Sequence, residues 1–180
     1  MKHLITTLLF FSVVCIPATA QYGRTQYGRM RLRPQIVHPI IIVDITSAIG
    51  LSNVSVPYSH TMAGFTAAQG IQIDERVVIA LGTGFLFYNG GLLTPLFLDF
   101  RYRYYTYSKY TVYYFGNGGF LFNNAQHFEY SKMYLNPGAG LKYEFTRNFS
   151  ANFGLGLLVQ QGLRRDSFIN FKLGISYVIR

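Results

Sequence analysis

The side chains best suited to acid–base or nucleophilic chemistry lie in one polar stretch, where His127, Glu129 and Ser131 alternate with other residues. A serine, a histidine and a carboxylate are the parts of a hydrolytic site, and residues two apart share one face of an extended chain. Such neighbours stand about 7 Å apart, too far for direct hydrogen bonding, so the pattern favours a solvated polar loop. The chain has no zinc-type spacing, phosphate loop, nucleotide fingerprint or nucleophile elbow, and we expect no cofactor and no metal.

A second group of chemically capable residues is charged. Asp99, Arg101 and Arg103 alternate with large apolar side chains, so an extended chain would place the charges on one face and the apolar residues on the other. The same test assigns further charges to that face. The predicted set is Asp44, Asp99, Arg101, Arg103, Lys142, Glu144 and Lys172.

The elements that must position these charges show period-two patterns. Residues 133–145, 148–160 and 168–179 each set large apolar side chains against Gly, Asn, Ser or Lys. Charged residues make up only 13% of the chain, against roughly 25% in soluble proteins, so too few are present to solvate a second face. Two-faced strands of this kind predict a barrel with lipid outside.

The turn signals divide the chain into eight extended segments, each long enough to cross hydrocarbon as a tilted strand. Tight connections are expected at 74–75, 106–108 and 146–147 and longer ones elsewhere, including 89–95. This alternation predicts an eight-stranded antiparallel up-and-down transmembrane β-barrel over residues 40–180, with both chain ends in the periplasm. The segments are Ile41–Leu51, Ser59–Ile73, Arg76–Tyr88, Leu96–Tyr105, Lys109–Phe122, Lys132–Phe145, Asn148–Gln160 and Phe168–Ile179.

One competing interpretation is a membrane helix over Val77–Leu98, which carries no charge. Several glycines and Pro95 argue against a helix, and the first half of the stretch alternates as a strand does. A hairpin accounts for the whole stretch.

The N-terminus has the pattern of an export signal over residues 1–20, with an apolar run and an Ala18-Thr19-Ala20 cleavage site. The only cysteine, Cys15, lies within it, so the mature chain would carry no thiol. We expect a basic flexible periplasmic arm over residues 21–39, because Arg24, Arg29, Arg31 and Arg33 stand there without an acid. The arm could hold an anionic periplasmic partner by charge, whereas an exported chain rarely meets nucleic acid.

Seven charges in the lumen of an eight-stranded barrel would have to pair, because such a lumen is only wide enough to be filled by side chains. The four cations and three anions therefore predict a plugged barrel, with Asn117, Asn136, Asn152 and Asn170 satisfying the remaining hydrogen bonds. A narrow anion or small-solute channel lined by the cations is the alternative.

Tyrosines crowd both sides of the turn predicted at 106–108. The predicted aromatic girdle at the headgroup level is Tyr102, Tyr104, Tyr110 and Tyr114, and Tyr105, Tyr107 and Tyr113 lie in the same cluster. Lys132, Arg164 and Arg165 are expected on outer loops, where they could meet lipopolysaccharide phosphates.

The sequence also resembles a family. The stretches Leu81-Gly82-Thr83-Gly84-Phe85 and Thr94-Pro95-Leu96-Phe97-Leu98-Asp99-Phe100-Arg101-Tyr102 are similar to those of small outer-membrane barrel proteins of the Bacteroidetes lineage, with OmpA/OmpX-like architecture. The ending Val178-Ile179-Arg180 departs from the outward aromatic residue on which such barrels commonly end. The resemblance implies location in the outer membrane and fold, and it does not imply a particular activity.

From these observations we expect an integral outer-membrane protein with a structural or interaction role and no catalysis. Its partners would be outer-membrane lipid and lipopolysaccharide. The other two classes that remain open are the narrow channel and an outer-membrane lipid-modifying enzyme that uses the polar loop.

Overall fold

The computed structural model describes residues 36–51, 60–89, 91–104, 109–124, 132–161 and 165–180. The export signal, most of the basic arm, the tight turn at 106–108, and His127, Glu129 and Ser131 lie outside these residues. Among the residues that are described, no helix is long and apolar enough to cross a membrane.

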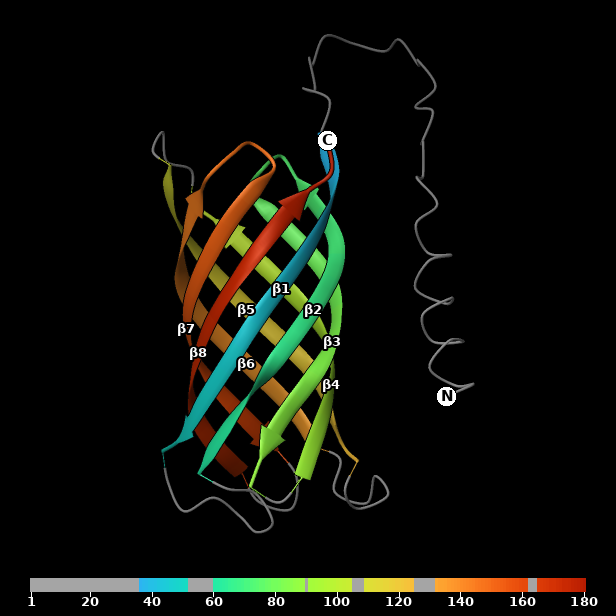
Figure 1. Ribbon diagram of the computed structural model, residues 1–180, viewed down its shortest axis with the longest axis vertical. Coiled ribbons are helices and arrows are strands. Elements are labelled where there is room, and N and C mark those ends of the chain that lie inside the picture. The colour runs from blue at the N-terminus through green and yellow to red at the C-terminus, as the bar shows by residue number, and fades with distance from the viewer. Residues whose placement is uncertain (1–35, 52–59, 90, 105–108, 125–131, 162–164) are drawn as a thin grey trace, which may run out of the picture. The chain divides into compact units, whose positions relative to one another are not determined.

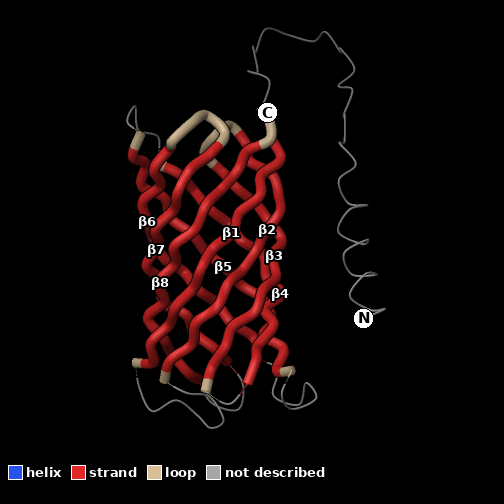
Figure 2. The backbone as a smooth tube through the Cα atoms, viewed as in Figure 1, coloured by secondary structure: helices blue, strands red, loops and turns tan. Residues whose placement is uncertain are grey.

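Eight antiparallel strands form a closed barrel, in which each strand pairs with its neighbours in sequence and β8 pairs with β1 (Figures 1 and 2). The predicted fold class is therefore confirmed. The strands are β1 Val37–Gly50, β2 Thr61–Ile73, β3 Val77–Tyr88, β4 Gly91–Arg103, β5 Tyr110–Asn123, β6 Lys132–Glu144, β7 Phe149–Gln161 and β8 Arg165–Val178.

Three strands begin earlier than the sequence predicted. β1 begins at Val37, so the last residues assigned to the basic arm belong to the barrel, and β8 begins at Arg165. β4 begins at Gly91, which reduces the expected long connection at 89–95 to Asn89 and Gly90. That expectation was wrong because β4 runs through Pro95.

Pro95 is tolerated because the hydrogen-bond ladder is interrupted where it lies. Pairing of β3 with β4 runs to Thr83 opposite Leu96 and resumes at Leu86 opposite Leu93. Pro137 lies in the same kind of gap between β6 and β7. A proline has no N–H to donate, so it fits a strand only where the ladder does not require one.

The barrel has two unlike ends. At one end, Ile36, residues 74–76, residues 145–148 and Arg180 lie together, and we call it the turn end. The N–H of Asp74 donates to the carbonyl of Ile36 at 2.9 Å, and the N–H of Ile179 donates to the carbonyl of Pro39 at 2.9 Å. The opposite end, which holds residues 51 and 60 and the β3–β4, β5–β6 and β7–β8 connections, is the loop end.

The β2–β3 connection at the turn end is a tight hairpin turn. Asp74 and Glu75 both have positive φ, at 48° and 59°. Positive φ at both central positions, with the N–H of Arg76 donating to the carbonyl of Ile73 at 3.0 Å, is the pattern of a type I′ turn. The Asp74 carboxylate also accepts a hydrogen bond from the N–H of Ile36 at 3.0 Å, which ties the start of β1 to the turn.

The register fixes the tilt of the strands. A path along paired residues that leaves β1 at position 38 returns to β1 at position 48, so the shear is ten residues. Eight strands with this shear are tilted by about 40° and enclose a narrow lumen. The path is His38, Gln72, Val78, Arg101, Phe115, Gly138, Gly156, Asn170 and Ala48.

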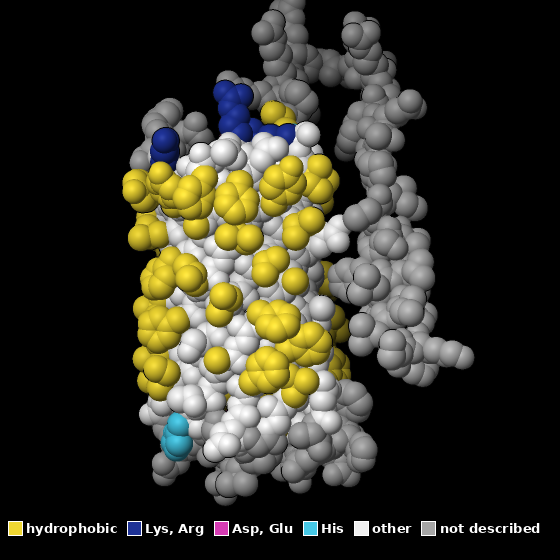
Figure 3. All heavy atoms as spheres, in the orientation of Figure 1, with side chains coloured by type: hydrophobic (Ala, Val, Ile, Leu, Met, Phe, Trp, Pro, Cys, Tyr) yellow, Lys and Arg dark blue, Asp and Glu magenta, His cyan; other side chains and the backbone are white. Residues whose placement is uncertain are grey.

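Alternate residues face the lumen and the outside along every strand. In β1 the inward residues Ile42, Asp44 and Thr46 are buried, while Val43 and Ile45 are exposed. Figure 3 shows hydrophobic side chains spread over the wall of the face in view, with Lys and Arg confined to the turn end. The wall therefore has an apolar outer surface and a mixed interior.

Inward glycines make room for large side chains inside the narrow lumen. A Cβ on Gly138 would lie 2.4 Å from the Phe115 ring, and one on Gly174 would lie 1.9 Å from Oδ1 of Asp44. Real Cβ atoms do not approach other atoms so closely, so these positions require glycine.

We predict that Gly174→Ala lowers the free energy of unfolding by about 1–3 kcal/mol, because the added methyl overlaps Asp44 and the backbone of Val43. Urea unfolding of the chain folded in detergent micelles measures the change. Gly116→Ala is the matched control, since nothing lies within 4 Å of the position its Cβ would take. Equal effects at the two sites would contradict the assignment of Gly174 to a crowded lumen.

The filled lumen as the candidate functional site

The lumen near the loop end is occupied by a buried apolar layer, to which β1, β2, β3, β4, β5, β7 and β8 contribute and against which Tyr134 of β6 packs. Because side chains from all eight strands meet there, the layer spans the cross-section of the barrel. Its residues are Ala48, Met62, Leu86, Tyr88, Leu93, Leu121, Leu158 and Phe168.

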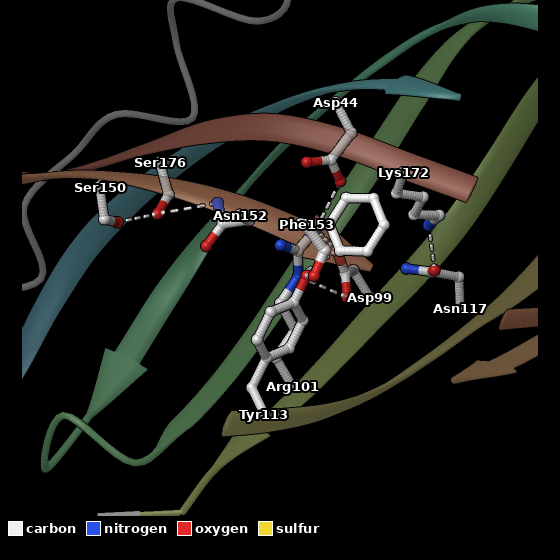
Figure 4. A network of polar contacts seen from close by, with 10 residues as sticks. All are labelled: Asp44, Asp99, Arg101, Tyr113, Asn117, Ser150, Asn152, Phe153, Lys172 and Ser176. Carbon is white, nitrogen blue, oxygen red and sulfur yellow. Dashed lines mark hydrogen bonds and ion pairs between the residues drawn. The ribbon is translucent and has the colours of Figure 1, made fainter. Parts of the chain in front are cut away.

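A cluster of three ions lies deeper in the lumen, and we call it the Arg101 triad. Nη2 of Arg101 lies 2.6 Å from Oδ2 of Asp44 and 2.8 Å from Oδ2 of Asp99, and Nε donates to Asp99 at 3.0 Å (Figure 4). All three side chains are at most 5% exposed. Arg101 bridges β1 and β4 because its planar guanidinium presents several donors in fixed directions.

Lys172 is held differently, by neutral groups. Its ammonium donates to Oδ1 of Asn117 (Figure 4). It also lies 5.1 Å from the centroid of the Phe115 ring. A buried cation can be stabilised by an amide oxygen and an aromatic face. Lys172 therefore lies near the Arg101 triad without forming a close ion pair in the described part of the chain.

The remaining predicted charges form two smaller groups toward the turn end. Nη1 of Arg103 donates to Oε1 of Gln72 at 2.8 Å, and Lys142 pairs with Glu144. The Glu144 side chain is 44% exposed, so this pair opens to solvent. The seven predicted residues thus share the inward face, but they form separate groups and not one network.

One buried ion pair was missed, because Lys132 was assigned to an outer loop and Asp166 to a connection. Nζ of Lys132 lies 2.6 Å from Oδ2 of Asp166, and both side chains are buried. β6 begins at Lys132 and β8 at Arg165, so both residues lie inside strands. The alternation of side chains along a strand was the available signal. Lys132 lies an even number of residues from the inward Asn136, and Asp166 lies an even number from the inward Asn170, so each shares the inward face.

The inward asparagines do not play the uniform role that was predicted. Asn152 donates to the hydroxyl of Ser176 at 3.3 Å, and Ser176 shares a hydrogen bond of 2.7 Å with Ser150 (Figure 4). Asn117, Asn136 and Asn170, in contrast, each have a buried side-chain atom without a hydrogen-bond partner among the described residues. The prediction that all four satisfy the hydrogen bonding of the lumen was therefore wrong for these three.

On the outer face, Tyr102, Tyr104, Tyr110 and Tyr114 are exposed, and the first three lie at or next to the turn-end limits of β4 and β5. Aromatic contacts extend from them around the barrel: Tyr110 to Tyr143 with centroids 4.9 Å apart, Tyr143 to Phe145 at 4.9 Å, and Phe145 to Phe149 at 5.7 Å.

Tyr113 was placed in the same cluster by sequence, but it faces the lumen, where its ring lies 5.7 Å from Cζ of Arg101. Its position follows from strand alternation, because Thr111 and Phe115, two residues to either side on β5, are buried on the same face. Tyr105 and Tyr107 lie outside the described residues.

The described polar groups of the lumen connect strands to one another through ion pairs and hydrogen bonds. No described group of three His, Cys, Asp or Glu residues is placed to hold a metal ion. Arg164 lies outside the described residues, and the side chain of Arg165 is not described.

The fold is similar to that of solved β-barrel structures. No family model and no curated protein matches the chain. Neisserial surface protein A is similar, with a TM-score of 0.55 and 13% identity over 78% of this chain and 96% of that one. The likeness establishes the fold.

Two further solved structures are similar at the same level. The N-terminal β-barrel domain of Pseudomonas aeruginosa OprF has a TM-score of 0.51 and 19% identity, covering 78% of this chain and 97% of that domain. The outer membrane protein AlkL, solved in lipid bilayers, has a TM-score of 0.51 and 11% identity, covering 88% and 95%. At these identities the likeness does not extend to activity.

We predict that Arg101→Met lowers the free energy of unfolding by about 3–5 kcal/mol, because two buried carboxylates lose their common cation. Urea unfolding in detergent micelles measures the loss, and adding Asp44→Asn and Asp99→Asn to the variant restores much of it. Arg180→Met is the control, because the partly exposed Arg180–Glu75 pair contributes under about 1 kcal/mol. Similar losses for Arg101 and Arg180 would show that the triad does not stabilise the wall.

Proposed function

We propose that the protein is an integral outer-membrane barrel whose lumen is filled by side chains and whose role is structural or interactive, without catalysis. The observation that carries this proposal is the contrast between the two faces of each strand. The outward face is apolar along its length, whereas the inward face contains buried ion pairs. A water-soluble barrel would have the opposite arrangement, with its charges outside.

The dimensions of the wall support placement in a bilayer. The strands are 12 to 14 residues long. At about 3.3 Å per residue and a tilt of about 40°, such strands rise roughly 30 Å, which is the thickness of the hydrocarbon core. A closed barrel also leaves no unpaired edge in lipid.

The aromatic rings mark one membrane interface, and the short turns beside them give the orientation that we propose. The chain of rings from Tyr110 to Phe149 lies at the turn end, where tyrosine hydroxyls would reach the headgroups while the rings remain in the apolar band. Short turns lie on the periplasmic side in bacterial outer-membrane barrels, so the turn end and Arg180 would face the periplasm. Outer-membrane lipid and lipopolysaccharide would be the immediate partners.

The filled lumen favours a plug over a channel. The apolar layer fills the lumen near the loop end, and the Arg101 triad lies on the turn-end side of this layer with its charges already paired. An ion crossing the barrel would have to lose its hydration shell and break these pairs.

We predict that Leu98→Arg lowers the free energy of unfolding in lipid vesicles by about 2–4 kcal/mol, because Leu98 faces outward in the middle of β4. Met133→Arg, near the loop end of β6, is expected to cost under about 1 kcal/mol. The pair is well matched, since Leu98 is 62% and Met133 is 61% exposed. If both substitutions were equally mild, the outer surface would face water and the membrane proposal would fail.

We further predict that the purified chain, folded in detergent, migrates differently on gels with and without boiling and shows no single-channel conductance in planar bilayers. The mobility shift confirms that the sample is a folded barrel. Reproducible conductance from the same sample would replace the plug with the narrow anion or small-solute channel.

A further inference from the structure

A small cavity lies in the lumen between the apolar layer and the Arg101 triad. Its volume is about 20 Å³, and the polar residues around it come from β1, β2, β6 and β8. Leu86 and Leu158 of the apolar layer border it, as does Lys172. The cavity is therefore bordered both by the apolar layer and by Lys172, which lies near the Arg101 triad.

Three of the lining residues are buried and carry polar atoms without a hydrogen-bond partner in the described part of the chain. These atoms are Oγ1 of Thr46, Oδ1 of Asn136, and both Oδ1 and Nδ2 of Asn170. Each residue is at most 4% exposed. Leaving such a group unsatisfied costs about 1–3 kcal/mol, so several of them around one cavity call for a ligand.

The size of the cavity and the chemistry of its lining select the ligand. A cavity of about 10–15 Å³ holds one water, so this one accommodates one or at most two. The partner must both donate and accept, because the Asn136 and Asn170 oxygens accept, Nδ2 of Asn170 donates, and the Thr46 hydroxyl does either. An anion could not donate to the two oxygens, and a cation would be opposed by Lys172.

We propose that this cavity is a binding site for a resident water that bridges Thr46 on β1, Asn136 on β6 and Asn170 on β8. Asn136 on β6 and Thr46 on β1 lie on strands that are not neighbours in the barrel, so the water links parts of the wall that share no strand pairing. The apolar layer separates it from the loop end, and the water is a structural component of the lumen. The inference rests on the interior alone and holds whether or not the barrel lies in a membrane.

A double-mutant cycle tests the link. Thr46→Val removes a hydroxyl at nearly constant shape, and Asn136→Leu removes the amide. If one water serves both residues, either substitution alone already disrupts the bridge. The double variant should then lose less free energy of unfolding than the two single variants lose in sum. The expected coupling is roughly three-fold or more in the unfolding equilibrium constant in detergent micelles.

Thr111→Val combined with Asn136→Leu is the matched control, because Thr111 is buried near the turn end and does not line the cavity. The effects of these two substitutions on the free energy of unfolding should be additive. Additivity of both pairs would overturn the proposal.

Diffraction supplies an independent measurement that does not require the variants to fold. Crystals of the unaltered chain grown in bromide, at a resolution that shows ordered water, should show a peak about 2.7–3.2 Å from the Thr46, Asn136 and Asn170 atoms without anomalous signal. An anomalous peak would identify an anion, and no density would leave the atoms without a ligand. Either result would overturn the proposal.

Discussion

The closed register of eight strands is the constraint on which the rest of the structure depends. A shear of ten residues sets the tilt and the radius together, and the radius leaves room only for side chains. Every inward residue must therefore be compatible with its neighbours across the lumen. Gly138 and Gly174 are small because Phe115 and Asp44 occupy the space beside them.

The same constraint determines how charge is accommodated. A wide lumen could leave its charges hydrated, but a narrow one brings them within contact distance. Arg101 is thus shared by two carboxylates, Lys172 is held by an amide and a ring, and Lys132 is paired near the loop end. The apolar layer and the ion pairs are two ways of filling one restricted volume.

Much of this architecture could be predicted from the sequence, because strand periodicity has a direct physical cause. Alternation placed Asp99, Arg101 and Lys172 on the inward face and their neighbours Leu98 and Phe100 outside. Parity does not give height along the barrel or identify the residue across the lumen, since these depend on register. The pairing of Arg101 with Asp44, the separation of Arg103 and Lys142 from the triad, and the unsatisfied amide of Asn170 could not be predicted for that reason. Two errors had another cause. Pro95 was assigned to a connection, although β4 continues through it, and Lys132 was expected to face an outer loop, although its side chain is buried at the start of β6.

The pairing of β8 with β1 also affects how the protein is made. Ile40 lies opposite Val178 and Ala48 lies opposite Asn170, so the seam joins residues that are almost the whole barrel apart in sequence. The strand that closes the cylinder is the last one to leave the ribosome, and until it arrives β1 presents an open edge to any other chain. A barrel of this topology therefore cannot close its wall before β8 has been made, and until then the unpaired edge of β1 is a site at which chains can aggregate.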